Sequence, residues 1–292
     1  MANAKAIKAK IKSINNIQKI TSALEVVSTV KLQKVKKQAD NFKYYMNEFL
    51  YILDMVDFSR IFQDKTQQSG KELLVIVGSE KGLCGALNSK LFKKVYDETK
   101  SNKENYDVFA VGKKALEFFT RTGYNIVGVL NLKDNFSEKD LAELRAFLIK
   151  SLDDKKYDKI TIVFNYFKNT MVQIPTNLQV YPLLRENFEE FAKTIELDVN
   201  LDKEYNQDII IEPSEEEFYD FVMKKFISDM VYGSVLQNKA WEHASRMIAM
   251  KNAKDNSIDL KKTLTITYNK QRQAAVTQEI SEIVSAKVAM ES

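Results

Sequence analysis

The sequence has few of the residues that interrupt helices and few of those that carry most enzyme chemistry. Its 292 residues include eight glycines, three prolines, one cysteine and one histidine. The lone cysteine, Cys84, excludes an internal disulfide, which fits a reducing compartment. The lone histidine, His243, excludes a metal site built on several histidines, and any serine or cysteine triad would have to use it. No run approaches 18 apolar residues, so we expect no membrane-spanning segment.

Glycine and proline are almost absent from the two ends of the chain. Residues 1–69 contain neither, and residues 214–292 contain no proline and one glycine, Gly233. A helix over the last stretch would span roughly 110 Å at 1.5 Å per residue, too long for a compact domain to bury. The first stretch has the apolar spacing of an amphipathic helix, with Ile7, Ile11, Ile14, Ile17, Ile20, Leu24 and Val27. Because each long helix needs a long partner, we expect the two to form an antiparallel coiled coil.

The middle of the chain has a different pattern. Seven of the eight glycines lie between Gly70 and Gly128. Short apolar runs alternate there with stretches of helical pattern, which predicts a mostly parallel sheet covered by helices. Pro175 and Pro182 place one of these strands near an edge of the sheet. We expect strands near residues 73–77, 107–111, 124–130, 159–167, 171–183 and 208–212, and helices over 88–100, up to 121 and over 137–152.

The predicted fold class is therefore α/β, a long antiparallel coiled coil combined with a Rossmann-like domain. We expect a first shaft helix over residues 1–60, the central domain over 70–212 and a second shaft helix over 213–292. Ser214 and Glu217 have the spacing of a capping box at the start of the second shaft helix. Gly233 and the polar residues 252–259 are where we expect that helix to bend or break.

Charge is unevenly distributed along the chain, although the net charge is only +4. Up to Lys43 there are ten lysines against two acids, Glu25 and Asp40, a local excess of +8. Residues 186–217 are acidic. A basic rod attached to an acidic body predicts an anionic partner along the rod, either an acidic protein surface or a nucleic acid.

A glycine-rich turn over residues 78–88 follows a predicted strand and precedes a predicted helix, an arrangement that can bind phosphate. Its spacing fits neither the P-loop nor the dinucleotide motif, so we interpret it as a tight structural turn. Cys84 in this turn lacks a nearby base and is expected to be a small buried residue. His243, beside Glu242 and Arg246, is expected at a surface or interface. The residues predict no catalytic centre, no metal site and no bound cofactor.

Residues 268–279 combine amides, cations, a threonine and an acid over about three helical turns, a mixture that suits a protein interface. The segment 268–285, YNKQRQAAVTQEISEIVS, resembles the C-terminal signature of the γ subunits of F-type ATP synthases. Residues 242–256 are similar to the same family. So are residues 17–27, IQKITSALEVV, and the glycine turn 82–88, GLCGALN.

The resemblance implies a rotor shaft without a catalytic site of its own. In the family, the coiled coil occupies the central cavity of an α₃β₃ ring, and the α/β domain contacts the ε subunit and the membrane ring of c subunits. Such a shaft couples ion-driven rotation of the c-ring to the conformational cycle of the catalytic β subunits, for ATP synthesis or hydrolysis. The implied location is peripheral, on the cytoplasmic face of the cell membrane, with no insertion into it and no bound nucleic acid.

Position by position, the resemblance assigns contacts with β subunits to one set of residues: Arg272, Gln273, Thr277, Glu279 and Glu282 on the last helix, Leu24 and Glu25 on the first, and Arg246. The lysine-rich first helix would face anionic β-subunit segments. The chain departs from the family pattern at Ala86, Gly233, Trp241 and Lys287.

Two alternative functions follow from the residues alone. A basic helical hairpin can grip nucleic acid, although the rod lacks clustered arginines and aromatic stacking positions. The central sheet could instead belong to a small nucleotide-dependent enzyme, which would bind nucleotide through residues 70–210.

Overall fold

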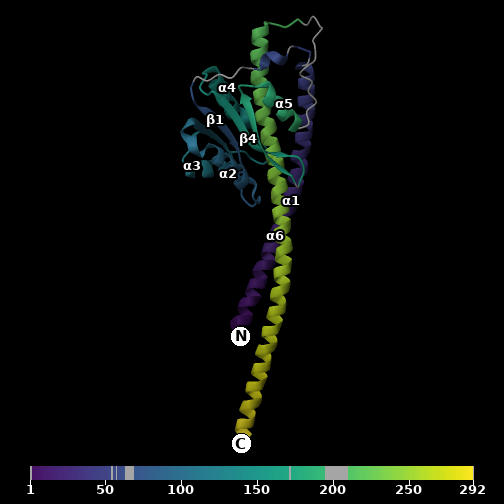
Figure 1. Ribbon diagram of the computed structural model, residues 1–292. Helices are drawn as coiled ribbons and strands as arrows, with labels where there is room; N and C mark the ends of the chain where they lie inside the picture. Colours follow the sequence, from purple (N-terminus) through teal and green to yellow (C-terminus); the bar gives the residue numbers. More distant parts are fainter. Residues whose placement is uncertain are drawn as a thin grey trace. The chain divides into compact units, whose positions relative to one another are not determined.

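The computed structural model describes residues 2–53, 55–56, 58–62, 69–170, 172–194 and 210–291. The first and last helices of the chain are long, and the sequence between them forms an α/β domain (Figure 1). The elements follow in the order α1 (Ala2–Leu53), η1 (Phe58–Ile61), β1 (Glu72–Val77), α2 (Leu87–Thr99), η2 (Lys100–Asn105), β2 (Tyr106–Val111), α3 (Lys113–Arg121), β3 (Asn125–Leu130), η3 (Glu138–Leu141), α4 (Ala142–Asp153), β4 (Lys159–Phe167), β5 (Gln173–Tyr181), α5 (Arg185–Thr194) and α6 (Glu215–Glu291).

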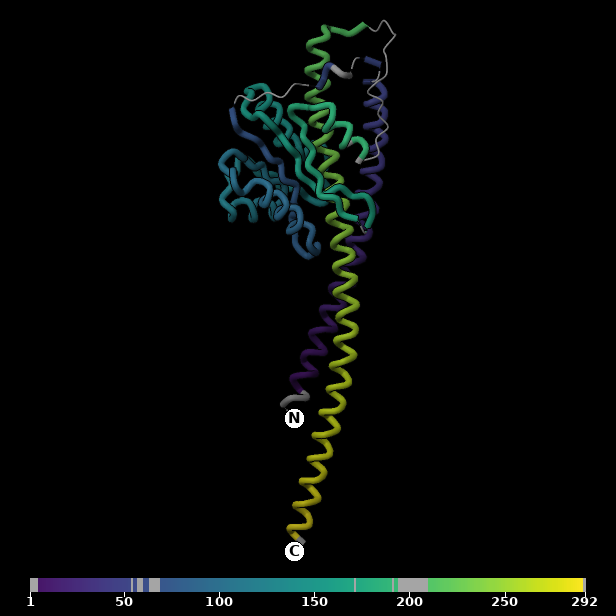
Figure 2. Tube along the Cα trace, in the orientation of Figure 1, coloured from purple at the N-terminus to yellow at the C-terminus, as the bar shows by residue number. Residues whose placement is uncertain are grey.

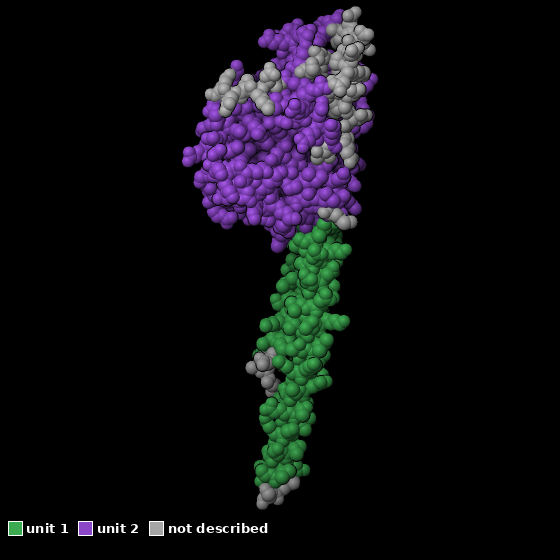
Figure 3. Space-filling model, viewed as in Figure 1, with its two compact units in different colours: residues 1–29, 246–292 green, residues 30–245 purple. Residues whose placement is uncertain are grey.

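The chain divides into two compact units, coloured separately in Figure 3. Unit 1 consists of Met1–Thr29 and Arg246–Ser292, and unit 2 is Val30–Ser245. Unit 1 is therefore built from part of α1 and part of α6. Unit 2 holds the remaining parts of these helices together with the sheet and its covering helices. The trace in Figure 2 follows both long helices continuously from one unit into the other.

The sheet of unit 2 has the strand order β3-β2-β1-β4-β5. Strand β1 is parallel to β2 and to β4, β3 is parallel to β2, and β5 is antiparallel to β4. The residues of β1 from Leu73 to Val77 are all buried, as expected for a central strand covered on both faces. Strand β5 forms an edge and contains Pro175, which confirms the edge position predicted from proline.

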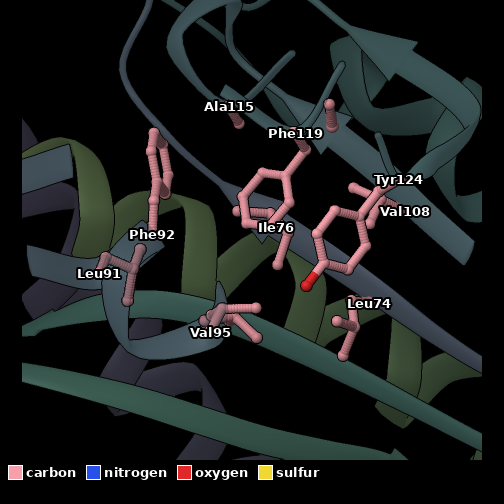
Figure 4. Close-up of a cluster of buried hydrophobic side chains, with 11 residues drawn as sticks. Leu74, Ile76, Leu91, Phe92, Val95, Val108, Ala115, Phe119 and Tyr124 are labelled. Carbon is pink, nitrogen blue, oxygen red and sulfur yellow. The ribbon is translucent and has the colours of Figure 1, made fainter. Parts of the chain in front are cut away.

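A core cluster fills the space between this sheet and helices α2 and α3 (Figure 4). Phe92 of α2 meets Phe119 of α3 edge to face, with 5.6 Å between ring centroids. Ile76 of β1 lies in the same cluster and is fully buried. Tyr124 belongs to the cluster as well, and its hydroxyl is 2.5 Å from the Thr99 hydroxyl, so its one polar atom is hydrogen-bonded. The sheet and its helices therefore form a complete core.

The long helices pack against each other within unit 2. The Tyr45 hydroxyl donates to Asp229 Oδ2 at 2.9 Å, and Lys225 pairs with Asp229 Oδ1 at 2.5 Å. One turn along, the ring of Phe42 lies against Gly233 so closely that a Cβ there would be 2.3 Å from Phe42 Cε1. Helix α6 continues as one helix through Gly233 and through residues 252–259. The helix was expected to bend or break at these two places, and a break is wrong at both; Gly233 makes room for an aromatic ring.

The boundaries of the last helix were predicted well, but the strand before it was not. Ser214 Oγ accepts the backbone N–H of Glu217 at 3.3 Å, as the capping-box pattern predicts. Residues 210–212 belong to no strand, and 208 and 209 lie outside the described residues. Ile210 is 87% exposed, so its side chain packs against no sheet. In the part of the chain that the structure describes, no helix is both long and apolar enough to cross a membrane.

Candidate contact surface on the terminal helices

The two helical segments of unit 1 run antiparallel. Lys254 pairs with Glu25 at 2.6 Å, and Lys261 Nζ donates to Asn15 Oδ1 at 2.8 Å. The residue number therefore rises along α6 as it falls along α1. The hydrogen bond that Lys254 donates to the Glu25 carboxylate raises the pKa of the half-buried Lys254 ammonium. These contacts confirm that the two ends of the chain lie side by side.

The seam between these helices is narrow and partly polar. On α1 the buried residues are spaced by seven: Ile14, Thr21 and Ser28. On α6, Met250 and Ser257 repeat the same spacing, which is that of a coiled coil. The hydroxyls of Thr21 and Ser257 donate to carbonyls of their own helices, at 3.0 Å and 2.6 Å. The seam therefore buries polar side chains without leaving these hydroxyls unsatisfied.

Many of the larger apolar side chains of unit 1 point away from the seam. On α1, Ile20 is 59% exposed and Val26 is 60% exposed; on α6, Ile266 is 52% exposed. Scattered apolar residues are normal on a protein surface, but a series of them along a two-helix rod indicates a contact surface.

Among the residues that the structure describes, no helix covers the end of α6 beyond Ala275. Gln271 and Ala275 are half-buried, whereas every residue from Val276 to Met290 is exposed. Apolar residues recur through this segment: Val276, Ile280, Ile283, Val284, Val288 and Met290. A single helix with this composition is only marginally stable in water without a partner.

The five predicted contact residues nearest the end of α6 lie on the surface. Arg272, Gln273, Thr277, Glu279 and Glu282 are exposed. At 3.6 residues per turn they cover about 220° of the helix circumference. The geometry does not gather them into one pocket. It distributes charged, amide and apolar groups around the rod, which suits a partner that surrounds it.

The remaining predicted contacts lie nearer to the seam. Leu24, Glu25 and Arg246 are half-buried in unit 1. The Glu25 carboxylate is already engaged by Lys254, a partner that sequence reasoning missed. No local signal links residues that lie more than 200 positions apart, although a lone acid on a lysine-rich helix indicates that a cation faces it.

The glycine turn is an internally bonded structure. The backbone N–H of Ser79 donates to Asn88 Oδ1 at 3.1 Å, and Asn88 Nδ2 donates to Ser79 Oγ at 2.7 Å. A Cβ on Gly112 would lie 2.6 Å from the carbonyl oxygen of Gly78, so the two loops touch through their backbones. Cys84 is buried within the turn, as predicted. These bonds favour the structural interpretation over a phosphate site.

The position of His243 differs from the prediction. His243 and Glu242 are both buried in unit 2, where Glu242 pairs with the buried Lys239 at 3.0 Å. The expectation for His243 was a surface or interface position, and the surface position is wrong, because His243 is buried within unit 2. A buried ion pair of this kind contributes more to a specific packing arrangement than to net stability.

The chain is similar to one family along almost its entire length. The family profile described as ATP synthase matches residues 3–290. The ATP synthase gamma chain of Buchnera aphidicola subsp. Baizongia pistaciae is 36% identical over 300 residues, covering 99% of both chains. The ATP synthase gamma chain of Xanthomonas axonopodis pv. citri is 34% identical, covering 99% of this chain and 100% of the relative.

Solved structures share the fold. A chain in the cryo-EM structure of the Euglena gracilis mitochondrial ATP synthase matches with a TM-score of 0.69 and 20% identity, covering 99% of this chain and 95% of that one. A chain from the central stalk and c-ring of the Tetrahymena thermophila mitochondrial ATP synthase matches with a TM-score of 0.60 and 23% identity. That match covers 80% of this chain and 99% of that one.

Proposed function

Since the chain belongs to the ATP synthase gamma chain family, we propose that the exposed end of α6 is the part that the catalytic ring encloses. The chain is a non-catalytic subunit of ATP synthase and forms its central stalk, the rotor.

The exposed end of α6 is the observation that supports this proposal. Residues 276–290 carry apolar side chains that water alone would surround, and the contact residues extend around the helix. A flat partner would cover one side only. A ring of α and β subunits covers every side, so that each apolar group finds an apolar neighbour at some angle of rotation.

Coupling arises because the shaft is not symmetric. At 100° per residue, the opposite charges of Arg272 and Glu279 lie about 20° apart around the helix axis. Thr277 lies about 140° from Arg272, on another side of the helix. A β subunit therefore meets different chemistry at each rotor angle. If the contact free energy differs between β conformations, rotation shifts the affinity of each nucleotide site, and nucleotide turnover drives rotation in return.

The finer partner assignments follow from the family resemblance and from charge. We assign the central cavity of an α₃β₃ ring to unit 1 and contacts with the ε subunit and the c-ring to the α/β domain. The complex would lie on the cytoplasmic face of the cell membrane, with this chain peripheral to it. The exposed lysines of α1, Lys5, Lys8, Lys12 and Lys19 among them, suit anionic segments of the ring.

Substitution in the assembled ATP synthase tests the assignment of the contact residues. Replacing Arg272 with Ala (R272A) should lower ATP synthesis and hydrolysis by about ten-fold, the equivalent of about 1.4 kcal/mol of lost coupling. Ser281 is also exposed, and its hydroxyl donates to the carbonyl of Thr277 on its own helix, so S281A is a matched control that should retain activity. Equal rates for R272A, S281A and the parent would contradict the contact assignment.

Copurification tests the partner assignments. The tagged chain, isolated from its host in mild detergent, should bring down α, β, ε and c subunits in fixed ratio. If the tagged chain instead copurifies with RNA and no ATP synthase subunits, and if the RNA is released when the salt concentration is raised, the nucleic-acid alternative is supported.

A further inference from the structure

The sheet of unit 2 has a position where doubly wound domains normally bind ligands. In such sheets the ligand lies beyond the carboxyl ends of the strands, at the point where the strand order reverses. Here β1 has β2 on one side and β4 on the other, so that point lies between β1 and β4. Their pairing ends at Ile76 and Val163, while β4 continues to Phe167. The last residues of β4 therefore extend past β1.

Helix α6 supplies acceptors to this extension. Asn238 Oδ1 accepts the backbone N–H of Asn165 at 3.1 Å and its Nδ2 at 3.2 Å. Gln237 Oε1 accepts the backbone N–H of Phe167 at 3.3 Å. Asn165 and Asn238 are both buried, and Gln173 Nε2 donates to Asn165 Oδ1 at 2.6 Å. The position where a ligand would bind is thus occupied by a pair of amide side chains from the shaft helix.

A second connection lies about two helical turns further along α6. Ser245 Oγ donates to the backbone carbonyl of Cys84 at 2.5 Å, inside the glycine turn that follows β1. A Cβ on Gly85 would lie 3.4 Å from Ser245 Oγ, which shows how closely the turn approaches the helix. Helix α6 is therefore hydrogen-bonded to the last residues of β4 and to the turn that follows β1.

We propose that residues 237–245 of α6 are a coupling segment that makes the α/β domain and the shaft helix turn as one body. The inference rests on the proposed rotary function. Apolar side chains packed as ridges in grooves resist separation but have no fixed direction, so a helix held by them alone can slip about its axis. Hydrogen bonds are directional, and bonds made at two levels of the helix oppose such a rotation. In this family member the ligand crevice of the sheet has become the attachment point of the shaft.

Angular fluctuation of the domain measures this connection directly. A bead is attached to a cysteine at Thr120 (T120C), an exposed position on α3, in the assembled complex with α and β subunits. The buried Cys84 does not compete for the label. The width of the angle distribution is recorded during pauses of ATP-driven rotation. Three single variants remove hydrogen bonds of this segment: N238L removes two, and Q237L and S245A remove one each. N102L on the exposed η2 segment is the matched control.

N238L removes two of the four hydrogen bonds. Two further links join α4 to α6, since Arg145 donates to Ser228 Oγ at 3.2 Å and Lys224 pairs with Asp153 at 3.0 Å. If all these bonds act as parallel springs, the angular variance should rise by less than about two-fold in N238L, by less again in Q237L and S245A, and not at all in N102L. Rotation speed without load should remain that of the parent. If the parent rotates and no folded variant has a broader angle distribution than the parent, the proposed role of the coupling segment is refuted. Absence of rotation in the parent itself would overturn the proposed function instead. Should N238L fail to assemble, Q237L and S245A decide, because each leaves the buried amide pair of Asn165 and Asn238 intact.

Discussion

The contact between Phe42 and Gly233 allows a prediction in which one substitution has opposite effects in two backgrounds. Gly233 lies inside the continuous helix α6, where alanine is favoured over glycine by about 1 kcal/mol. A Cβ there would lie 2.3 Å from Phe42 Cε1 and 2.9 Å from its Cζ. The ring is also held by Tyr232, at 5.4 Å between centroids, so it cannot move away without breaking that contact.

The two effects of G233A oppose each other in the parent. Forcing the ring aside should cost about 1–3 kcal/mol, as overpacking usually does. Set against the helix-propensity gain of about 1 kcal/mol, this leaves a net destabilisation of about 1 kcal/mol. In an F42A background the obstacle is absent and only the propensity gain remains. There G233A should stabilise the protein by about 1 kcal/mol, giving a coupling free energy of about 2 kcal/mol.

Guanidinium unfolding of the full chain measures both values. Trp241 is the only tryptophan, is buried in unit 2 and packs on Phe167 at 5.9 Å, so its fluorescence reports the unit that contains the contact. The four proteins are the parent, F42A, G233A and the double variant. If G233A changes the free energy of unfolding with the same sign in both backgrounds, the close packing of ring and glycine is not what requires glycine at this position.

Three further outcomes are expected. Burial and the hydrogen bond to Asp107 raise the pKa of the Tyr157 hydroxyl above its ordinary value near 10. The contribution of this hydroxyl to the free energy of unfolding is complete below about pH 10 and is lost as pH rises through the folded-state pKa. Y157F should therefore lose about 1 kcal/mol at neutral pH and depend less on pH above 10, and equal alkaline unfolding curves would contradict this. Because the raised pKa of Lys254 depends mainly on Glu25, E25Q should return it toward its ordinary value in an NMR titration, and an unchanged pKa would mean that the ion pair does not form in solution. Deleting residues 268–292 should weaken ring association and torque while circular dichroism shows that the sheet remains folded; full coupling by the shortened chain would refute the site assignment.

The paired ends were predictable because two long stretches without glycine or proline leave little choice but long helices. Which residues form the seam was not predictable. Periodicity marked Ile17 and Ile20 as candidates for the apolar face, yet both are largely exposed, while Thr21 and Ser28 are buried. A shaft divides its apolar residues between a partner helix and a surrounding surface, and spacing alone does not distinguish the two.

The central domain was predictable where strands are buried on both faces. The run Leu73–Val77 is apolar throughout, as a central parallel strand requires. The run ending at Ile211 looked equally suitable, but a strand also needs a neighbouring strand, and that information is not local. For the same reason the buried position of His243 and the packing role of Gly233 became evident only in the folded chain.

The contact residues on α6 were predictable only through the family resemblance. Their amides and charges indicated an interface, but composition does not say that the partner surrounds the helix. That conclusion depends on the exposure of residues 276–290 on every side. The attachment of Asn238 to β4 had no sequence signal, since an asparagine in a helix is equally compatible with an exposed position.

The most direct test of the rotor account is to observe the chain turning inside its ring. A bead on the α/β domain of the chain, assembled with surface-fixed α and β subunits, is followed while ATP is hydrolysed. The account predicts stepwise rotation in one direction that requires ATP and loses torque when residues 268–292 are removed. A ring that hydrolyses ATP while the bead stays still, or moves without a preferred direction, would contradict it.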